Sequence, residues 1–409
     1  MKRKITSAYI LVLLLGTLFL PVCKAPVEYK VGLSDRQPIV NDGIFFDKFI
    51  EFLMRLSHKP SLSVCVIMDE NIIWSKGYGF YNIGKNKSAC LNTIYLSASI
   101  SKTVTATALM QLIENESYSI DLDEDVNNYL PFSLRNPNHP NVPITFRMLL
   151  SHRSSLTGDN MFWTCLSYIP GDPDIPDYPY PWLKNYLTPN GSAYTPVIWS
   201  DNLPGENFAY SNIGYSIVGY LVEVISGEKF DQYCKNHIFE PLNMFNTSFR
   251  LRDVNISNLA VPYQFKKGTY FPHPHYNMLV TYPAGSLRTS VDDLSHFLIA
   301  HMNNGMWNKI RILKNSTVEL MHKDHYATNN DERYGLGWII RKDKFGKKVI
   351  SHTGSIVGVQ TLMKYIPDER IGIIVFTNSM SPTLDLTTIE KFAFSLMSKL
   401  FLLKANMIK

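Results

Sequence analysis

The sequence has few cysteines, and none of them has the spacing of a metal site. The five are Cys23, Cys65, Cys90, Cys165 and Cys234, and they form no Cys-x-x-Cys pair and no cluster with histidine. This argues against a zinc site. Cys65 stands within the apolar stretch SLSVCVIM, so we expect a small buried hydrophobic residue rather than half of a disulfide. We expect neither a metal nor an organic cofactor.

The sequence also has little net charge once its first residues are set aside. Charged residues make up 18% of the 409, apolar residues 45%, and the formal net charge is +5. Removing the four cations of the N-terminal segment, Lys2, Arg3, Lys4 and Lys24, from this total leaves +1. A net charge this small does not indicate the basic surface that binding to nucleic acid or to an anionic membrane would require. We therefore expect no nucleic-acid partner.

Residues 1–25 have the pattern of a targeting segment. Three basic residues precede an apolar run from Ile5 to Val22, which is typical of a secretory signal peptide. The run is also about long enough to span a bilayer as an uncleaved anchor. Cleavage after Ala25 and retention in the membrane both stay open, and in either case we expect an exported protein.

Apolar periodicity predicts strands near both ends of the chain. The helical pattern of FFDKFIEFLMRLS is followed by two strand patterns, SLSVCVIM and IIWSKGYGFYN, on either side of a turn at Asp69-Glu70-Asn71. Four more strand patterns occur late in the chain, YGLGWII, KVISHTG, VQTLMKYIP and IGIIVFTN. A final amphipathic helix is predicted from about Leu384 to Leu403.

The middle of the chain predicts helices instead. They are expected in LSASISKTVTATALMQLIEN, DLDEDVNNYL, TFRMLLSH, NIGYSIVGYLVEVI, which Gly227 would end, and SVDDLSHFLIAHM, whose Ser290 and Asp293 form a capping box. Together these patterns indicate an α+β fold. An antiparallel sheet would come from about residues 40–98 and 290–409, and an all-α part would be inserted at about 99–289.

Residues 157–208 form a long stretch rich in proline, glycine and aromatic residues. Segments of this length inside a compact domain usually form functional lids or rims. An insertion that only covers the surface explains the same composition, so both interpretations stay open.

Ser99 and Lys102 have a spacing that suits nucleophilic catalysis. Residues three apart on a helix share a face, so the Lys102 amine can lie beside the Ser99 hydroxyl. A helix N-terminus at Ser99 would favour developing negative charge, and a buried lysine can lose its proton and act as a base. An ordinary solvated lysine accounts for the spacing equally well.

Two further motifs carry polar groups of the right kind. Tyr210-Ser211-Asn212 precedes a predicted helix, where a phenol could carry a proton and an amide could bind a substrate carbonyl. Helix capping by Ser211 or Asn212 is the alternative. His352-Thr353-Gly354 ends a predicted strand, where a glycine would let a substrate backbone lie against the strand edge, although a plain strand-end turn is also consistent.

In this order the three motifs resemble the serine β-lactamase and penicillin-binding-protein family, in its class C and D-alanyl-D-alanine carboxypeptidase branch. The segments ITFRMLLSHRSSL, PGENFAYSN, YPAGSLRTSVDDLSHFL, YGLGWII and HTGSIVGVQTLMKYIPDERIGIIVFTN are similar to recurring family segments. The resemblance runs from about residue 45 to the end of the sequence. It implies a β-lactamase/transpeptidase-like fold.

The resemblance also implies a role for each motif residue. Ser99 would be the nucleophile that accepts the acyl group, Lys102 its base and Tyr210 the proton shuttle to the leaving group. Asn212 would orient the substrate amide, and His352, Thr353 and Gly354 would form the third motif. The backbone N–H groups of Ser99 and Ser355 would form the oxyanion hole.

The chain departs from the family pattern at three places. His352 stands where many β-lactamases of the family have lysine, and histidine is charged only part of the time near neutral pH. Ser155 and Arg153 stand in a loop where the family prefers glycine and threonine. Arg288 could substitute as an anchor for a substrate carboxylate, but a surface arginine is the simpler expectation.

These observations favour a serine hydrolase that forms an acyl-enzyme with a small-molecule, peptide or ester substrate. Because His352 replaces lysine, carboxypeptidase-like or esterase-like activity ranks above β-lactamase activity. A catalytically silent relative with a binding or assembly role is the alternative, and an acyltransferase differs from a hydrolase only in the acceptor. The natural substrate and the oligomeric state stay open.

Overall fold

The computed structural model describes residues 43–157, 169–174, 178–326, 333–343 and 345–380. The chain divides into two compact units, Met1–Phe45 and Phe46–Lys409. The features below belong to the second unit, apart from the first residues of helix α2 (Gly43–Leu56). The predicted targeting segment and the predicted helix at 384–403 lie outside the described residues.

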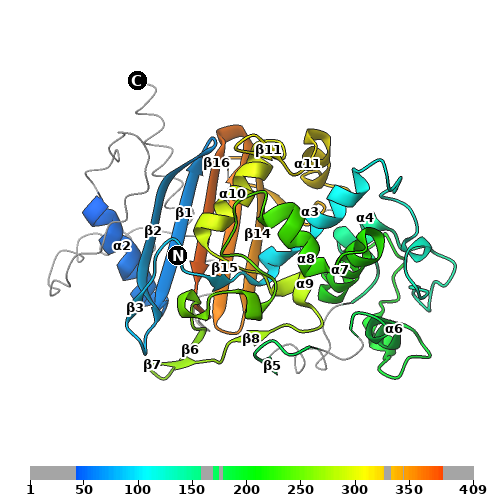
Figure 1. The fold of residues 1–409 in the computed structure, drawn as a ribbon, viewed down its shortest axis with the longest axis horizontal. Coiled ribbons are helices and arrows are strands. Elements are labelled where there is room, and N and C mark those ends of the chain that lie inside the picture. Colours follow the sequence, from blue (N-terminus) through cyan, green and yellow to red (C-terminus); the bar gives the residue numbers. More distant parts are fainter. Residues whose placement is uncertain (1–42, 158–168, 175–177, 327–332, 344, 381–409) are drawn as a thin grey trace, which may run out of the picture. The chain divides into compact units, whose positions relative to one another are not determined.

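One antiparallel sheet joins the two ends of the second unit. Its strand order is β12-β13-β14-β15-β16-β1-β2-β3, and every neighbouring pair is antiparallel. The early strands are β1 (Ser61–Met68), β2 (Asn71–Asn82) and β3 (Lys87–Ser88). The late strands are β12 (Arg333–Tyr334), β13 (Ile339–Lys342), β14 (Lys348–Ile356), β15 (Val359–Ile366) and β16 (Ile371–Thr377). Figure 1 shows the resulting contact in colour, with blue β1 beside orange β16.

Apolar residues on both faces explain why the central strands are almost wholly buried. On one face, helix α10 (Val291–Met302) packs against β1 and β16, and Gly372 leaves room there for Met302 and Leu298. On the other face, Ile50 and Met54 of α2 join a cluster with residues of β1, β15 and β16. Ser290 caps α10 by accepting a hydrogen bond from the Asp293 N–H at 3.0 Å, which confirms the predicted helix start. Cys65 in β1 is fully buried as expected, and burial raises the pKa of its thiol to about 12.

A group of helices lies beside the sheet, with α3 (Ser101–Ile113) at its centre (Figure 1). Helix α3 packs against α7 (Asn212–Ser226), α8 (Phe230–Cys234) and α9 (Tyr282–Gly285), and α4 (Phe146–Leu150) packs on α7. Residues 101–110 of α3 are all buried. This is expected of a helix that lies in the core. Gly227 ends α7 with a left-handed φ of 76°, which confirms the predicted helix end.

Several predicted elements differ from the structure. YGLGWII is not one strand: it spans the turn between β12 and β13, where Gly337 has φ of +85°. The part expected to be all-α also contains short strands, among them β6 (Tyr263–Lys266) and β7 (Thr269–Pro272).

DLDEDVNNYL forms only a short 3-10 helix, Val126–Asn128, because the Asp125 carboxylate accepts the Asn127 N–H at 3.0 Å and holds the backbone in a turn. The hairpin turn after β1 contains Asp69 and Glu70 alone, since Asn71 already belongs to β2.

The long stretch 157–208 is described in part. It contributes β5 (Ile169–Pro170), helix α6 (Trp182–Leu187) and a 3-10 helix at Pro196–Ile198. Three residues of α6, Leu183, Tyr186 and Leu187, are buried in the main core, so part of this stretch is built into the domain. Among the described residues, no helix is both long and apolar enough to cross a bilayer.

Buried histidines are an unusual component of the core. His301 on α10 lies 5.3 Å from His322, ring to ring, and both rings pack against Trp338. Burial lowers the pKa of His301 to about 3, and burial together with His301 and Lys348 lowers the pKa of His322 well below its usual range. Both imidazoles are therefore neutral in the folded protein at neutral pH.

We expect the free energy of unfolding to decrease as the pH falls below about 6.5. A histidine that is neutral in the folded state but protonated in the unfolded chain lowers stability by up to about 1.4 kcal/mol per pH unit. For His301 this effect should extend from pH 6.5 down to its folded pKa of about 3. Urea denaturation between pH 7 and pH 5 measures the slope. His301→Leu should make it shallower, and an unchanged slope would contradict this account.

Candidate active site

Ser99 lies in a short 3-10 helix, Ala98–Ile100, directly before α3. It is half-buried, whereas its neighbours from Thr93 to Ala98 and from Ile100 to Met110 are buried. Lys102 stands in the first turn of α3 and is fully buried. The solvated-lysine interpretation of the Ser-x-x-Lys spacing is therefore wrong.

The other serines of this stretch hold the turn in place. The Ser97 N–H and hydroxyl both donate to the Leu287 carbonyl, at 2.7 and 2.9 Å. The Ser101 hydroxyl donates to the Ala98 carbonyl at 2.6 Å and accepts the Leu287 N–H at 3.0 Å. Ala98 has φ of +49°, a conformation that costs a non-glycine residue roughly 1–2 kcal/mol and that surrounding contacts must maintain.

Oxygen atoms of Ser99, Asn212 and Ala284 lie around the Lys102 amine. Nζ lies 3.2 Å from Ser99 Oγ, 2.7 Å from Asn212 Oδ1 and 2.8 Å from the Ala284 carbonyl. A neutral amine has two N–H bonds and one lone pair. If Lys102 gives up its proton, Asn212 and Ala284 can accept the two remaining N–H bonds, and the lone pair would then point toward the Ser99 hydroxyl.

The start of α7 brings Tyr210 and Asn212 to the same place. Ser211 is the N-cap and accepts the Gly214 N–H at 3.1 Å, so capping occupies Ser211 and leaves its neighbours for other contacts. The Tyr210 ring centroid lies 4.7 Å from Lys102 Nζ, and Tyr210 is 36% exposed. A phenol at this position can reach both the lysine and an incoming molecule.

His352 on β14 is buried and neutral. Its Nδ1 donates to the Thr353 carbonyl and its Nε2 accepts the Tyr334 hydroxyl, both at 2.8 Å. Burial, followed by the nearby Lys102 charge, lowers the pKa of His352 to about 3. The expected partial charge near neutral pH is therefore absent, and His352 presents no cation to a ligand.

Gly354 lets β14 approach the turn that carries Ser99. A Cβ at Gly354 would lie 2.3 Å from the Ser97 carbonyl oxygen and 2.3 Å from Thr361 Oγ1. Thr361 on the adjacent β15 donates its hydroxyl to that same carbonyl at 2.8 Å. The glycine therefore makes space for the chain itself, and not for a substrate backbone as the sequence suggested.

The last residues of β14 have a free edge. Strand β13 pairs with β14 only over Lys348–Ser351, whereas β15 pairs with β14 as far as Ile356. Thr353 is half-buried and Ser355 exposed. Within the described part of the sheet, backbone groups beyond Ser351 on the β13 side are not used in strand pairing.

Arg288 is neither a surface residue nor a carboxylate anchor. It is 1% exposed and donates to the carbonyls of Ser286 and Tyr276 and to Asn277 Oδ1. Burial lowers its pKa to about 10. The sequence pattern could not show this, because two of the acceptors are backbone carbonyls.

Two residues near the site were not singled out from the sequence. Tyr334 binds His352, and His152 accepts the Ser211 N–H at its Nδ1 at 3.0 Å. His152 lies in the segment ITFRMLLSHRSSL that resembled the family, which is the one signal that could have identified it. Tyr334 is the first residue of YGLGWII, another segment that resembled the family, and so had a signal of the same kind.

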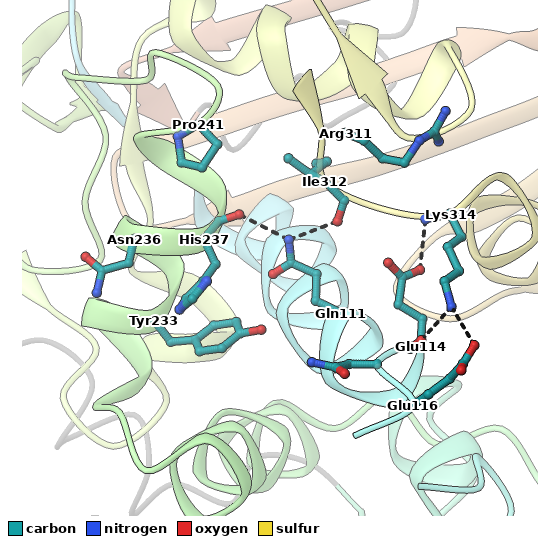
Figure 2. A pocket seen from close by; sticks show the side chains of 11 residues that line it. Gln111, Glu114, Glu116, Tyr233, Asn236, His237, Pro241, Arg311, Ile312 and Lys314 are labelled. Atoms are coloured by element: carbon teal, nitrogen blue, oxygen red, sulfur yellow. Dashed lines mark hydrogen bonds and ion pairs between the residues drawn. The ribbon is translucent and has the colours of Figure 1, made fainter. Parts of the chain in front are cut away.

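A hollow of about 590 Å³ lies elsewhere, beside the C-terminal half of α3 (Figure 2). Gln111 donates to the His237 and Ile312 carbonyls at its base. Lys314 donates to the Glu114 carbonyl and lies 3.5 Å from Glu116. No serine or cysteine lines it among the described residues, so we place the chemistry at Ser99.

Proteins of known sequence or structure are similar to this chain. "Protein flp" of Staphylococcus aureus strain N315 is 26% identical over 339 residues, which cover 81% of this chain and 62% of that protein. The chain therefore spans less than two thirds of that relative. An octameric penicillin-binding protein homologue from Pyrococcus abyssi has 27% identity and a TM-score of 0.70, covering 88% of this chain and 78% of that one.

A D-alanine carboxypeptidase, AmpC, from Burkholderia cenocepacia shares the fold at 20% identity, with a TM-score of 0.67 and coverage of 87% of this chain and 98% of that one. These likenesses confirm the expected β-lactamase/transpeptidase-like fold. The family model described as Beta-lactamase matches residues 46–395. This match includes all three motifs that meet around Lys102, and the chain belongs to the beta-lactamase family.

Proposed function

We propose that this protein is a serine hydrolase that works through an acyl-enzyme. The observation that carries the proposal is the buried Lys102 amine, whose Nζ lies 3.2 Å from Ser99 Oγ and within hydrogen-bonding distance of Asn212 Oδ1 and the Ala284 carbonyl. Membership of the beta-lactamase family supports it. The carboxypeptidase fold-relative adds a precedent for this framework in hydrolysis.

Acylation begins at Ser99. Lys102 takes the proton from the hydroxyl as Oγ attacks the substrate carbonyl carbon, which gives a tetrahedral intermediate with a negatively charged oxygen. Collapse of the intermediate breaks the bond to the leaving group, which takes a proton through Tyr210. Water then attacks the ester on Ser99, releases the acid and returns the proton to Ser99.

The oxyanion would be held between the turn and β14. The backbone N–H groups of Ser99 and Ser355 are the proposed donors, and the Gly354 contact with Ser97 sets how far apart these two segments lie. Such donors lower the barrier because they are already oriented before charge develops. The free edge of β14 beyond Ser351 leaves the substrate side of this arrangement open.

The state of His352 bears on the substrate class. A neutral His352 and an Arg288 that is bound to its own loop offer no charge for a substrate carboxylate. The exposed Phe208 lies beside Tyr334, with ring centroids 5.7 Å apart, and adds an apolar wall. We propose that esters and amides without a required carboxylate are the preferred substrates.

Intact-mass spectrometry should detect one fluorophosphonate adduct on the wild-type protein and none on Ser99→Ala, because the activated hydroxyl is the reactive group. Incubation with a fluorescent penicillin in parallel tests for recognition of a lactam. Absence of both adducts on protein shown to be folded would favour a catalytically silent relative with a binding role.

Gly354→Ala should reduce the rate of acylation by about 100-fold or more, the loss typical when an oxyanion donor is displaced. The added Cβ must push the Ser97–Ser99 turn away from β14. Gly84→Ala is the matched control, because a Cβ there would meet only the Asn82 side chain at 3.8 Å. Equal rates for the two variants would contradict the proposed oxyanion hole.

A pair of peptides that differ only in the leaving group tests the substrate class. We expect kcat/KM for an acyl-D-alanyl-D-alanine to be no higher than for the matching D-alaninamide, since neither His352 nor Arg288 offers a cation to the carboxylate. The comparison should hold at pH 6 and pH 8, because His352 stays neutral at both. A tenfold preference for the free carboxylate would contradict the proposal.

A further inference from the structure

His152 is fixed in an uncommon backbone conformation next to the proposed active site. It follows α4 and has φ of +59°, which few non-glycine residues adopt. Conformational outliers of this kind concentrate at functional sites, because surrounding structure must maintain them. The side chain is 1% exposed, so His152 does not itself meet solvent.

One residue binds the chain on both sides of Tyr210. The His152 carbonyl accepts the Ala209 N–H at 2.7 Å, and its Nδ1 accepts the Ser211 N–H at 3.0 Å. The imidazole also lies against the Tyr210 ring, with centroids 4.3 Å apart. His152 therefore contacts the backbone on both sides of Tyr210 and the Tyr210 ring itself.

The ring has a defined tautomer. Because Nδ1 accepts a hydrogen bond, the proton of the neutral imidazole must lie on Nε2. Among the described residues Nε2 has no hydrogen-bond partner, and leaving a buried polar group unpaired costs roughly 1–3 kcal/mol. A leucine of similar size would avoid that cost but would lose the acceptor for Ser211.

The surroundings keep this acceptor available. Tyr215 lies 5.0 Å and Tyr334 4.7 Å from the ring, centroid to centroid. Burial, then the charge of Lys102 and the nearby His352, lower the pKa of His152 well below its usual range. Protonation of Nδ1, which would break the bond to Ser211, is thereby suppressed.

We propose that His152 is a positioning residue that holds Tyr210 and Asn212 against Lys102 through the Ser211 peptide. This inference rests on the proposed hydrolase function and goes beyond it. His152 touches no reacting atom in this scheme. Its contribution is to keep the Tyr210 hydroxyl where a departing alkoxide or amine can take its proton.

Two esters with the same acyl group separate positioning from general stability. p-Nitrophenyl butyrate releases a stable phenolate that needs no proton, whereas methyl butyrate releases an alkoxide that does. A displaced Tyr210 should therefore slow the methyl ester far more than the activated ester. Partial unfolding would lower both rates by the same factor.

The variants are chosen to keep or remove the acceptor. His152→Asn keeps an oxygen near the place of Nδ1, whereas His152→Leu removes it. We expect His152→Leu to lower kcat/KM for methyl butyrate about 100-fold, the scale of a misplaced catalytic group. We expect it to change p-nitrophenyl butyrate less than about tenfold, and His152→Asn to restore the wild-type ratio.

His301→Leu is the matched control. His301 is equally buried and neutral but lies in the core against Trp338, so its replacement should change stability and leave the ratio of the two ester rates unchanged. If His152→Leu does not fold, His152→Gln replaces it, because its longer side chain carries the amide past the position of Nδ1.

Equal losses on both esters, or an asparagine variant as impaired as the leucine or glutamine variant, would overturn this inference alone. A wild-type protein that hydrolyses neither ester, or activity that persists in Ser99→Ala, would overturn the proposed function and the inference together.

Discussion

The buried amine of Lys102 is the group on which the rest of the site depends. Burying a lysine is costly unless its N–H groups are bonded, and here the partners come from three separate places, the Ser99 turn, the start of α7 and the carbonyl of Ala284 in α9. A shift of one element would remove one of these contacts from the amine. The lysine thus links the relative positions of these elements to the reactivity of one hydroxyl.

The sheet supplies a second constraint, and it is steric. The turn before α3 lies so close to β14 that only glycine fits at position 354, and the Thr361 hydroxyl of β15 donates to the Ser97 carbonyl of that turn. Ala98 keeps a left-handed conformation in the same turn. Close approach and local strain both serve to place one half-exposed serine against a strand edge.

Periodicity and motif order were enough to predict the α+β fold and the residues that meet at Lys102. Short apolar runs such as SLSVCVIM identify strands that are buried on both faces of the sheet. The neutral state of His352 could not be predicted from the sequence, since it depends on burial and on the nearby Lys102. The burial of Arg288 was missed because carbonyl acceptors leave no trace in residue types. In DLDEDVNNYL, a local hydrogen bond from the Asn127 N–H to the Asp125 carboxylate outweighed helical periodicity.

The pairing of β1 with β16 has a consequence for folding. Leu62 pairs with Thr377, so β1 cannot pair with β16 until more than three hundred further residues have been synthesised. Contacts of such long range slow folding, because loop closure must be completed before they stabilise the chain. Until then β1 offers an apolar edge to other chains, a known route to aggregation. A nascent chain that stops short of Ile371 would contain Ser99, Lys102 and Tyr210 and still lack the strand that completes the sheet beneath them.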